Sequence, residues 1–143
     1  LHDALPICSV NFSISPETQV IDFGKFNLLD IRRHTMSKTF SIKTTKSQND
    51  QCTDGFKVSS SFYTEETLVE EDKALLIGNG LKLRLLDENA SPYTFNKYAE
   101  YADFTSDMLI YEKTYTAELS SIAGTPIEAG PFDTVVLFKI NYN

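Results

Sequence analysis

Alternation of apolar and polar residues predicts β-strands over most of the chain. Val10, Phe12 and Ile14 alternate with polar residues until Pro16, which cannot donate to a strand ladder. A two-residue period or a short extended run recurs in five later segments, at about residues 20–23, 39–45, 56–62, 81–86 and 109–119. Short strands separated by turn residues are typical of a β-sandwich.

The most regular alternation follows Gly130-Pro131 and continues to the last residue of the sequence. One face carries Phe132, Thr134, Val136, Phe138, Ile140 and Tyr142, and the other carries Asp133, Val135, Leu137, Lys139, Asn141 and Asn143. This pattern predicts a strand with one strongly apolar side. It is either a plain core strand or a strand whose second edge pairs with another chain, because unpaired N–H and C=O groups invite such pairing.

Residues 67–76 depart from the alternation. Thr67 followed by Glu70 is a weak capping box, and leucines at helical spacing follow, so the segment is interpreted as either one or two helical turns or an acidic loop. Gly78-Asn79-Gly80 is interpreted as a turn, because the other residues of a phosphate-binding loop are absent.

Composition limits the possible partners. The chain has 143 residues, which corresponds to a single domain over 1–143, and its net charge of −7 argues against nucleic-acid binding. The longest apolar runs contain four residues, far short of the ~20 of a membrane-spanning helix. Residues 1–7 lack the basic start and long apolar middle of a signal peptide.

Catalytic and metal-binding chemistry has few candidate residues. His2 and His34 are the only histidines, and neither lies at ligand spacing from another donor, so no metal, no cofactor and no enzymatic activity are expected. The acidic stretch from Glu65 to Asp72 lacks the Asp/Asn ladder and central glycine of a calcium loop. Cys8 and Cys52 form either one structural disulfide or two inert core thiols.

Four motifs carry a resemblance to the pilus subunits that Gram-negative bacteria assemble through a periplasmic chaperone and an outer-membrane usher. They are Cys8 in the first strand with Cys52 at the end of the second, Ile21-Asp22-Phe23-Gly24, the strand from Gly80 to Asp87, and Gly130 fourteen residues from the end with a penultimate Tyr142. The family joins such a cysteine pair by a disulfide. The alternating Val136, Phe138 and Ile140 fall between Gly130 and Tyr142, as they do in the family.

The resemblance implies an all-β fold, an incomplete immunoglobulin-like β-sandwich of six to seven strands that lacks its last strand. In the family this strand is lent by the chaperone in the periplasm and later by the neighbouring subunit of an extracellular fimbrium used for adhesion. The implied subunit and chaperone groove comprises Gly130, Phe132, Val136, Phe138, Ile140, Tyr142 and Asn143.

Residues 1–7 are too short for a donor strand and include Pro6, so they are interpreted as a short or non-native segment. The alternatives are the pilin domain of a two-domain tip adhesin, which has no donor strand of its own, and, from another class, a complete secreted sandwich that binds a ligand.

Overall fold

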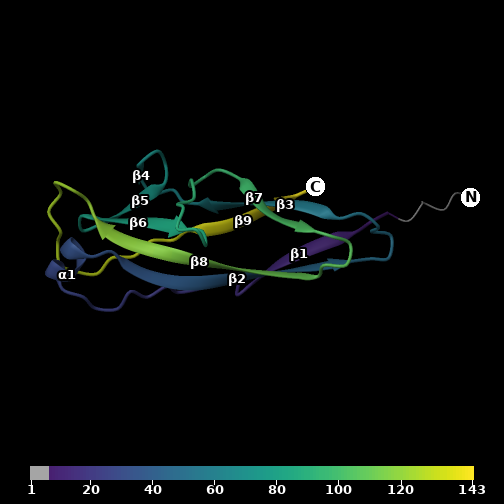
Figure 1. The fold of residues 1–143 in the computed structure, drawn as a ribbon, viewed down its shortest axis with the longest axis horizontal. Helices are drawn as coiled ribbons and strands as arrows, with labels where there is room; N and C mark the ends of the chain where they lie inside the picture. The colour runs from purple at the N-terminus through teal and green to yellow at the C-terminus, as the bar shows by residue number, and fades with distance from the viewer. Residues whose placement is uncertain (1–6) are drawn as a thin grey trace, which may run out of the picture.

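A computed structural model describes residues 7–143, which form two antiparallel β-sheets and one short helix (Figure 1). The larger sheet, sheet A, has six strands in the spatial order β1 (Val10–Ser15), β2 (Met36–Gln48), β8 (Ile110–Ser121), β6 (Leu81–Leu86), β5 (Ala74–Gly78) and β4 (Leu68–Val69). The smaller sheet, sheet B, has the order β7 (Ala99–Phe104), β3 (Phe56–Tyr63) and β9 (Leu137–Tyr142). The helix α1 (Leu28–Arg33) and strand β1 lie toward opposite ends of the long axis (Figure 1).

An aromatic core joins the two sheets. The ring of Phe62 on β3 lies 5.3 Å from that of Tyr115 on β8 and 5.3 Å from that of Phe138 on β9. The inward side chains of β6, of most of β3 and of the second half of β8 are buried, because alternation places every second residue between the sheets. This confirms the sandwich predicted from the two-residue period.

A disulfide between Cys8 and Cys52 ties the start of β1 to the segment after β2, with a Cα–Cα distance of 4.5 Å. The pairing of Val10 with Gln48 brings the two cysteines together at the end of this hairpin-like pair. Asn49 supports the junction by donating a 2.9 Å hydrogen bond from Nδ2 to the carbonyl of Ile7. Of the two sequence-based interpretations of the cysteines, the disulfide is therefore confirmed.

The predicted turn at Gly78-Asn79-Gly80 is also confirmed, and it connects β5 to β6. All three residues have positive φ, of 96°, 56° and 75°. Gly80 is the most constrained of them, because a Cβ at that position would collide with the backbone carbonyl of Pro126. The turn is thus fixed against the loop that follows β8.

Of the two interpretations of residues 67–76, the one or two helical turns are wrong, and the acidic loop is reduced to a short turn. Two short strands form instead, in which Leu68 pairs with Leu75 and Val69 pairs with Ala74. The acidic residues Glu70, Glu71 and Asp72 make the turn between them, all at positive φ. Pairing of β5 with β6 draws this segment into sheet A, and that tertiary contact outweighs the weak capping signal.

Besides β4 and β5, two elements were not predicted from the sequence. The helix α1 is only six residues long, and the Oδ1 of Asn27 caps it by accepting a 2.9 Å hydrogen bond from the backbone N–H of Asp30. Strand β7 has no clean alternation, and it pairs with β3 across an irregularity between Val58 and Ser59.

Two predicted strands differ from the structure. Residues 20–23 form no strand, and the terminal strand begins at Leu137 rather than at Phe132. Because β4, β5 and β7 were not predicted, the described chain has nine strands where six to seven were expected.

Candidate functional site

Strand β9 has one unpaired side. It pairs antiparallel with β3 from Tyr63↔Leu137 to Val58↔Tyr142, and no strand in the described part of the chain pairs with its other side. We call the unpaired side of residues 132–142 the terminal-strand edge. It contains every predicted groove residue except Gly130 and Asn143, which flank it.

The register shows which backbone groups point outward at this edge. The N–H of Asn143 donates a 3.2 Å hydrogen bond to the carbonyl of Lys57 on the β3 side. Successive residues of a strand direct their N–H and C=O groups to opposite sides. The backbone groups of Phe138, Ile140 and Tyr142 therefore face the unpaired side.

Side chains of the same segment face the sandwich interior without being fully covered. Phe132, Thr134, Val136, Phe138 and Ile140 are half-buried, whereas the residues between them are exposed. Val136, Phe138 and Ile140 pack against the main core cluster. The predicted alternation of the terminal segment is thus confirmed, and Phe138 and Ile140 present both unpaired backbone groups and incompletely buried apolar side chains at one edge.

Residues 132–136 keep the alternation but form no ladder on either side. Strand β3 ends at Tyr63, opposite Leu137. The backbone N–H of Thr64 donates to Asn96 Oδ1 (2.8 Å) and Asn96 Nδ2 donates to the Thr64 carbonyl (3.1 Å), on the side of β3 away from β9. Among residues 7–143, no backbone–backbone hydrogen bond reaches residues 131–136. The hydroxyl of Thr134, the one polar residue in the half-buried series, is buried and finds no partner in the described chain.

The segment of residues 16–27, which we call the facing segment, lies opposite the terminal-strand edge. Phe26 contacts Phe132 with ring centroids 5.9 Å apart, and Phe12, on β1 just before the facing segment, contacts Tyr142 at 4.6 Å. Ile21 and Phe23 are half-buried between these two contacts and pack against the core. The sequence signalled this segment only through Ile21-Asp22-Phe23-Gly24, which was interpreted as a short extended run and a motif of the resemblance rather than as part of a site.

The two ends of the predicted groove have distinct environments. Gly130 adopts a φ of 133°, and its carbonyl accepts a 3.2 Å hydrogen bond from Asn79 Nδ2 at the β5–β6 turn. Tyr142 is 39% exposed, with its ring against Phe12 and Phe56. The predicted site residues therefore form one continuous strip.

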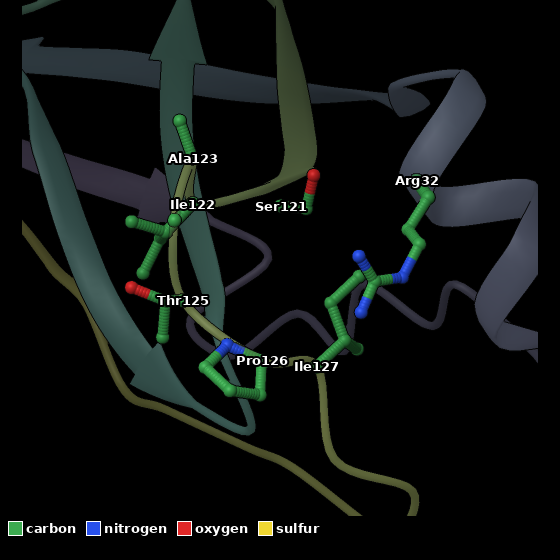
Figure 2. A pocket seen from close by; sticks show the side chains of 8 residues that line it. Arg32, Ser121, Ile122, Ala123, Thr125, Pro126 and Ile127 are labelled. Carbon is green, nitrogen blue, oxygen red and sulfur yellow. The ribbon is translucent and has the colours of Figure 1, made fainter.

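Two pockets in the described residues lie away from the terminal-strand edge. A pocket of about 380 Å³ separates Arg32 of α1 from the loop of residues 121–127, and Figure 2 shows the guanidinium beside Ile127. A second, of about 530 Å³, lies on the outer face of sheet A between β8 and residues 86–90. In residues 7–143 no group of three or more His, Cys, Asp or Glu side chains could hold a metal ion.

Two other predictions concern the surface. His34 is exposed, and His2 lies outside the described residues. Within residues 7–143, no helix is long and apolar enough to cross a membrane.

Known structures share this fold. No protein-family model matches the chain. The crystal structure of the P pilus rod subunit PapA is similar with a TM-score of 0.72 and 19% sequence identity, over 92% of this chain and 99% of PapA. A structure of a chaperone–usher pilus, described as revealing the molecular basis of rod uncoiling, is similar with a TM-score of 0.66 and 18% identity, over 92% of this chain and 87% of that chain. The chain therefore has the fold of chaperone–usher pilus subunits.

Proposed function

We propose that this chain is a structural subunit of a chaperone–usher fimbrium and that a strand from another protein pairs along its terminal-strand edge. One observation carries the proposal: Phe138 and Ile140 direct unpaired backbone groups and half-covered apolar side chains to the same open side. An added strand would satisfy the backbone groups and cover the apolar side chains in one step.

The physics of an open edge also accounts for the need for a chaperone. An unpaired strand beside apolar side chains is a template for aggregation, so a free subunit should be unstable or self-associate. A chaperone strand in the periplasm would protect the edge until the neighbouring subunit replaces it at the usher. The assembled fibre would then lie outside the cell and serve adhesion.

The proposed contact set follows the strip described above. Donor side chains would pack against Phe132, Val136, Phe138 and Ile140, with Gly130 and Tyr142 at the two ends. Asn143, which follows the last residue of β9 and is exposed, would lie at the end where the chaperone is anchored.

The alternative of a complete ligand-binding sandwich predicts a covered edge, and the unpaired β9 argues against it. The pilin domain of a tip adhesin would use the same edge in the same way.

The proposal is tested by placing one carboxylate on each face of β9. Phe138→Asp would put a charge among apolar groups, whereas Asn141→Asp adds the same charge on the exposed face of the same strand. We expect Phe138→Asp to lose co-purification with the periplasmic chaperone and Asn141→Asp to retain it, because burying an unpaired carboxylate costs several kcal/mol or more.

A milder variant separates loss of docking from loss of folding. Val136→Ser changes a half-buried residue outside the β3–β9 ladder, so the sandwich should still form and oxidise its disulfide. We expect weaker chaperone capture with normal disulfide formation. Capture of both Phe138→Asp and Val136→Ser at the level of Asn141→Asp would contradict the proposal.

A further inference from the structure

Exposed aliphatic side chains lie on the outer surface at both sides of the terminal-strand edge. On the outward face of the terminal segment, Val135 is 74% exposed and Leu137 is 50% exposed. Val20, on the facing segment, is 88% exposed. Two consecutive apolar positions on the solvent face of an edge strand are unusual, because such edges are normally protected by charged residues.

The aromatic contacts bring these residues to the two sides of one site. The facing segment and the terminal segment meet at Phe26–Phe132, and Phe12 meets Tyr142 beyond the other end. Val20 lies on the chain between Phe12 and Phe26, and Val135 and Leu137 lie between Phe132 and Tyr142. A strand inserted between the segments would therefore have Val135 and Leu137 beside its outward face, with Val20 on the opposite side.

The outward face of the terminal segment changes from apolar to polar along the chain. Leu137 is paired on the β3 side with Tyr63, over whose ring the Lys139 ammonium lies at 3.9 Å from the centroid. From Lys139 to Asn141 the outward residues are polar, whereas Val135 and Leu137 have no apolar neighbour on the open side among the strands of the described chain.

We infer that the donor strand is apolar on both faces where it passes Val135 and Leu137, and not only on the face directed into the sandwich. This inference rests on the proposed function, since it specifies the chemistry of the strand that docks there. Side chains directly opposite on one face of a sheet stabilise the pairing, so an outward valine or isoleucine of the donor would pack against Val135 and Leu137. The outward face thus contributes to the choice of partner.

Two peptides test the inference. Both have ten residues, valine at every inward position and identical charged tags. One carries valine at its two central outward positions and the other carries the isosteric threonine, which keeps β-propensity similar. The oxidised full chain is refolded with each labelled peptide, and the dissociation constant is measured by fluorescence anisotropy. We expect the outward-valine peptide to bind about two- to thirtyfold more tightly than the outward-threonine peptide, because it forms two additional apolar cross-strand pairs.

Variants of exposed residues provide the controls. In the double variant Val135→Thr/Leu137→Thr the preference should disappear, whereas Asn141→Thr, at an exposed outward position of the polar half, should retain it. Equal binding of the two peptides by the wild-type chain would overturn the inference and leave the proposed function intact. A preference that survives the double variant would also overturn it. Failure of both peptides to bind would instead refute the proposed function, on which the inference rests.

Discussion

Two buried tyrosines on facing strands give a sharp test of the core, because their hydroxyl groups have opposite environments. Tyr115 is 1% exposed, and its hydroxyl has no hydrogen-bond partner in the described chain. Tyr101 is 5% exposed, and its hydroxyl lies 2.8 Å from the Oγ1 of Thr44, which is itself fully buried. The change Tyr→Phe removes the same atom at both positions.

The two substitutions should change the free energy of unfolding in different directions. A buried polar group without a partner costs about 1–3 kcal/mol, so Tyr115→Phe should leave the fold equally stable or make it more stable by up to that amount. The ring packing against Phe40 and Phe62 is retained. Tyr101→Phe breaks a buried hydrogen bond and leaves Thr44 without its partner, so it should destabilise the fold by about 1–3 kcal/mol.

The assay is urea unfolding of the oxidised chain at pH 7, followed by far-ultraviolet circular dichroism. One donor-strand peptide, which pairs along the terminal-strand edge, is present at the same concentration in every sample, so its contribution to stability is common to all. Burial raises the pKa of both tyrosines above the ordinary value of 10.0, so neither ionises under these conditions. A loss of more than about 1 kcal/mol in Tyr115→Phe, or no loss in Tyr101→Phe, would refute the reasoning from hydroxyl satisfaction.

Two further predictions use the same unfolding assay. Replacing Cys8 and Cys52 with serine should lower the free energy of unfolding by up to about 4 kcal/mol, because a sequence separation of 44 residues is no longer constrained in the unfolded chain; an unchanged urea midpoint would contradict this. Gly80→Ala should cost at least about 2 kcal/mol, through positive φ and collision with the backbone of the loop after β8, whereas Gly124→Ala, at a similar φ of 77° with nothing near its Cβ position, should cost about 1 kcal/mol. Equal losses in the two glycine variants would show that the close approach at Gly80 has no energetic consequence.

The sequence predicted those strands whose two faces have different environments. Strands β1, β3, β6 and β8 each have one side on the core and one toward solvent, so the two-residue period was visible along the chain. Strands β4 and β5 pair with near neighbours in the chain, but β4 has only two residues and β5 begins with an apolar run instead of an alternation, so neither has a two-residue period. Strand β7 forms because β3, far earlier in the chain, offers a pairing partner, which local patterns do not reveal.

Only part of the candidate site could be predicted from the sequence. The residues from Phe132 to Tyr142 were found from alternation, because they lie on one continuous segment. The open edge itself depends on the strand order β7-β3-β9, in which nothing from the described chain follows β9. The contribution of the facing segment depends on the contacts of Phe12 and Phe26 with residues more than 100 positions away.

The mismatch between alternation and pairing is itself an argument about function. The half-buried series begins at Phe132, but the ladder with β3 begins only at Leu137, opposite Tyr63, the last residue of β3. Within the described chain, residues 132–136 therefore have the side-chain pattern of a strand without a strand partner. A two-residue period that extends beyond its internal ladder is expected where a second ladder forms on the other side, along the whole of residues 132–142. A donor strand that pairs only with residues 137–142, and leaves 132–136 unpaired when bound, would contradict this explanation of the pattern.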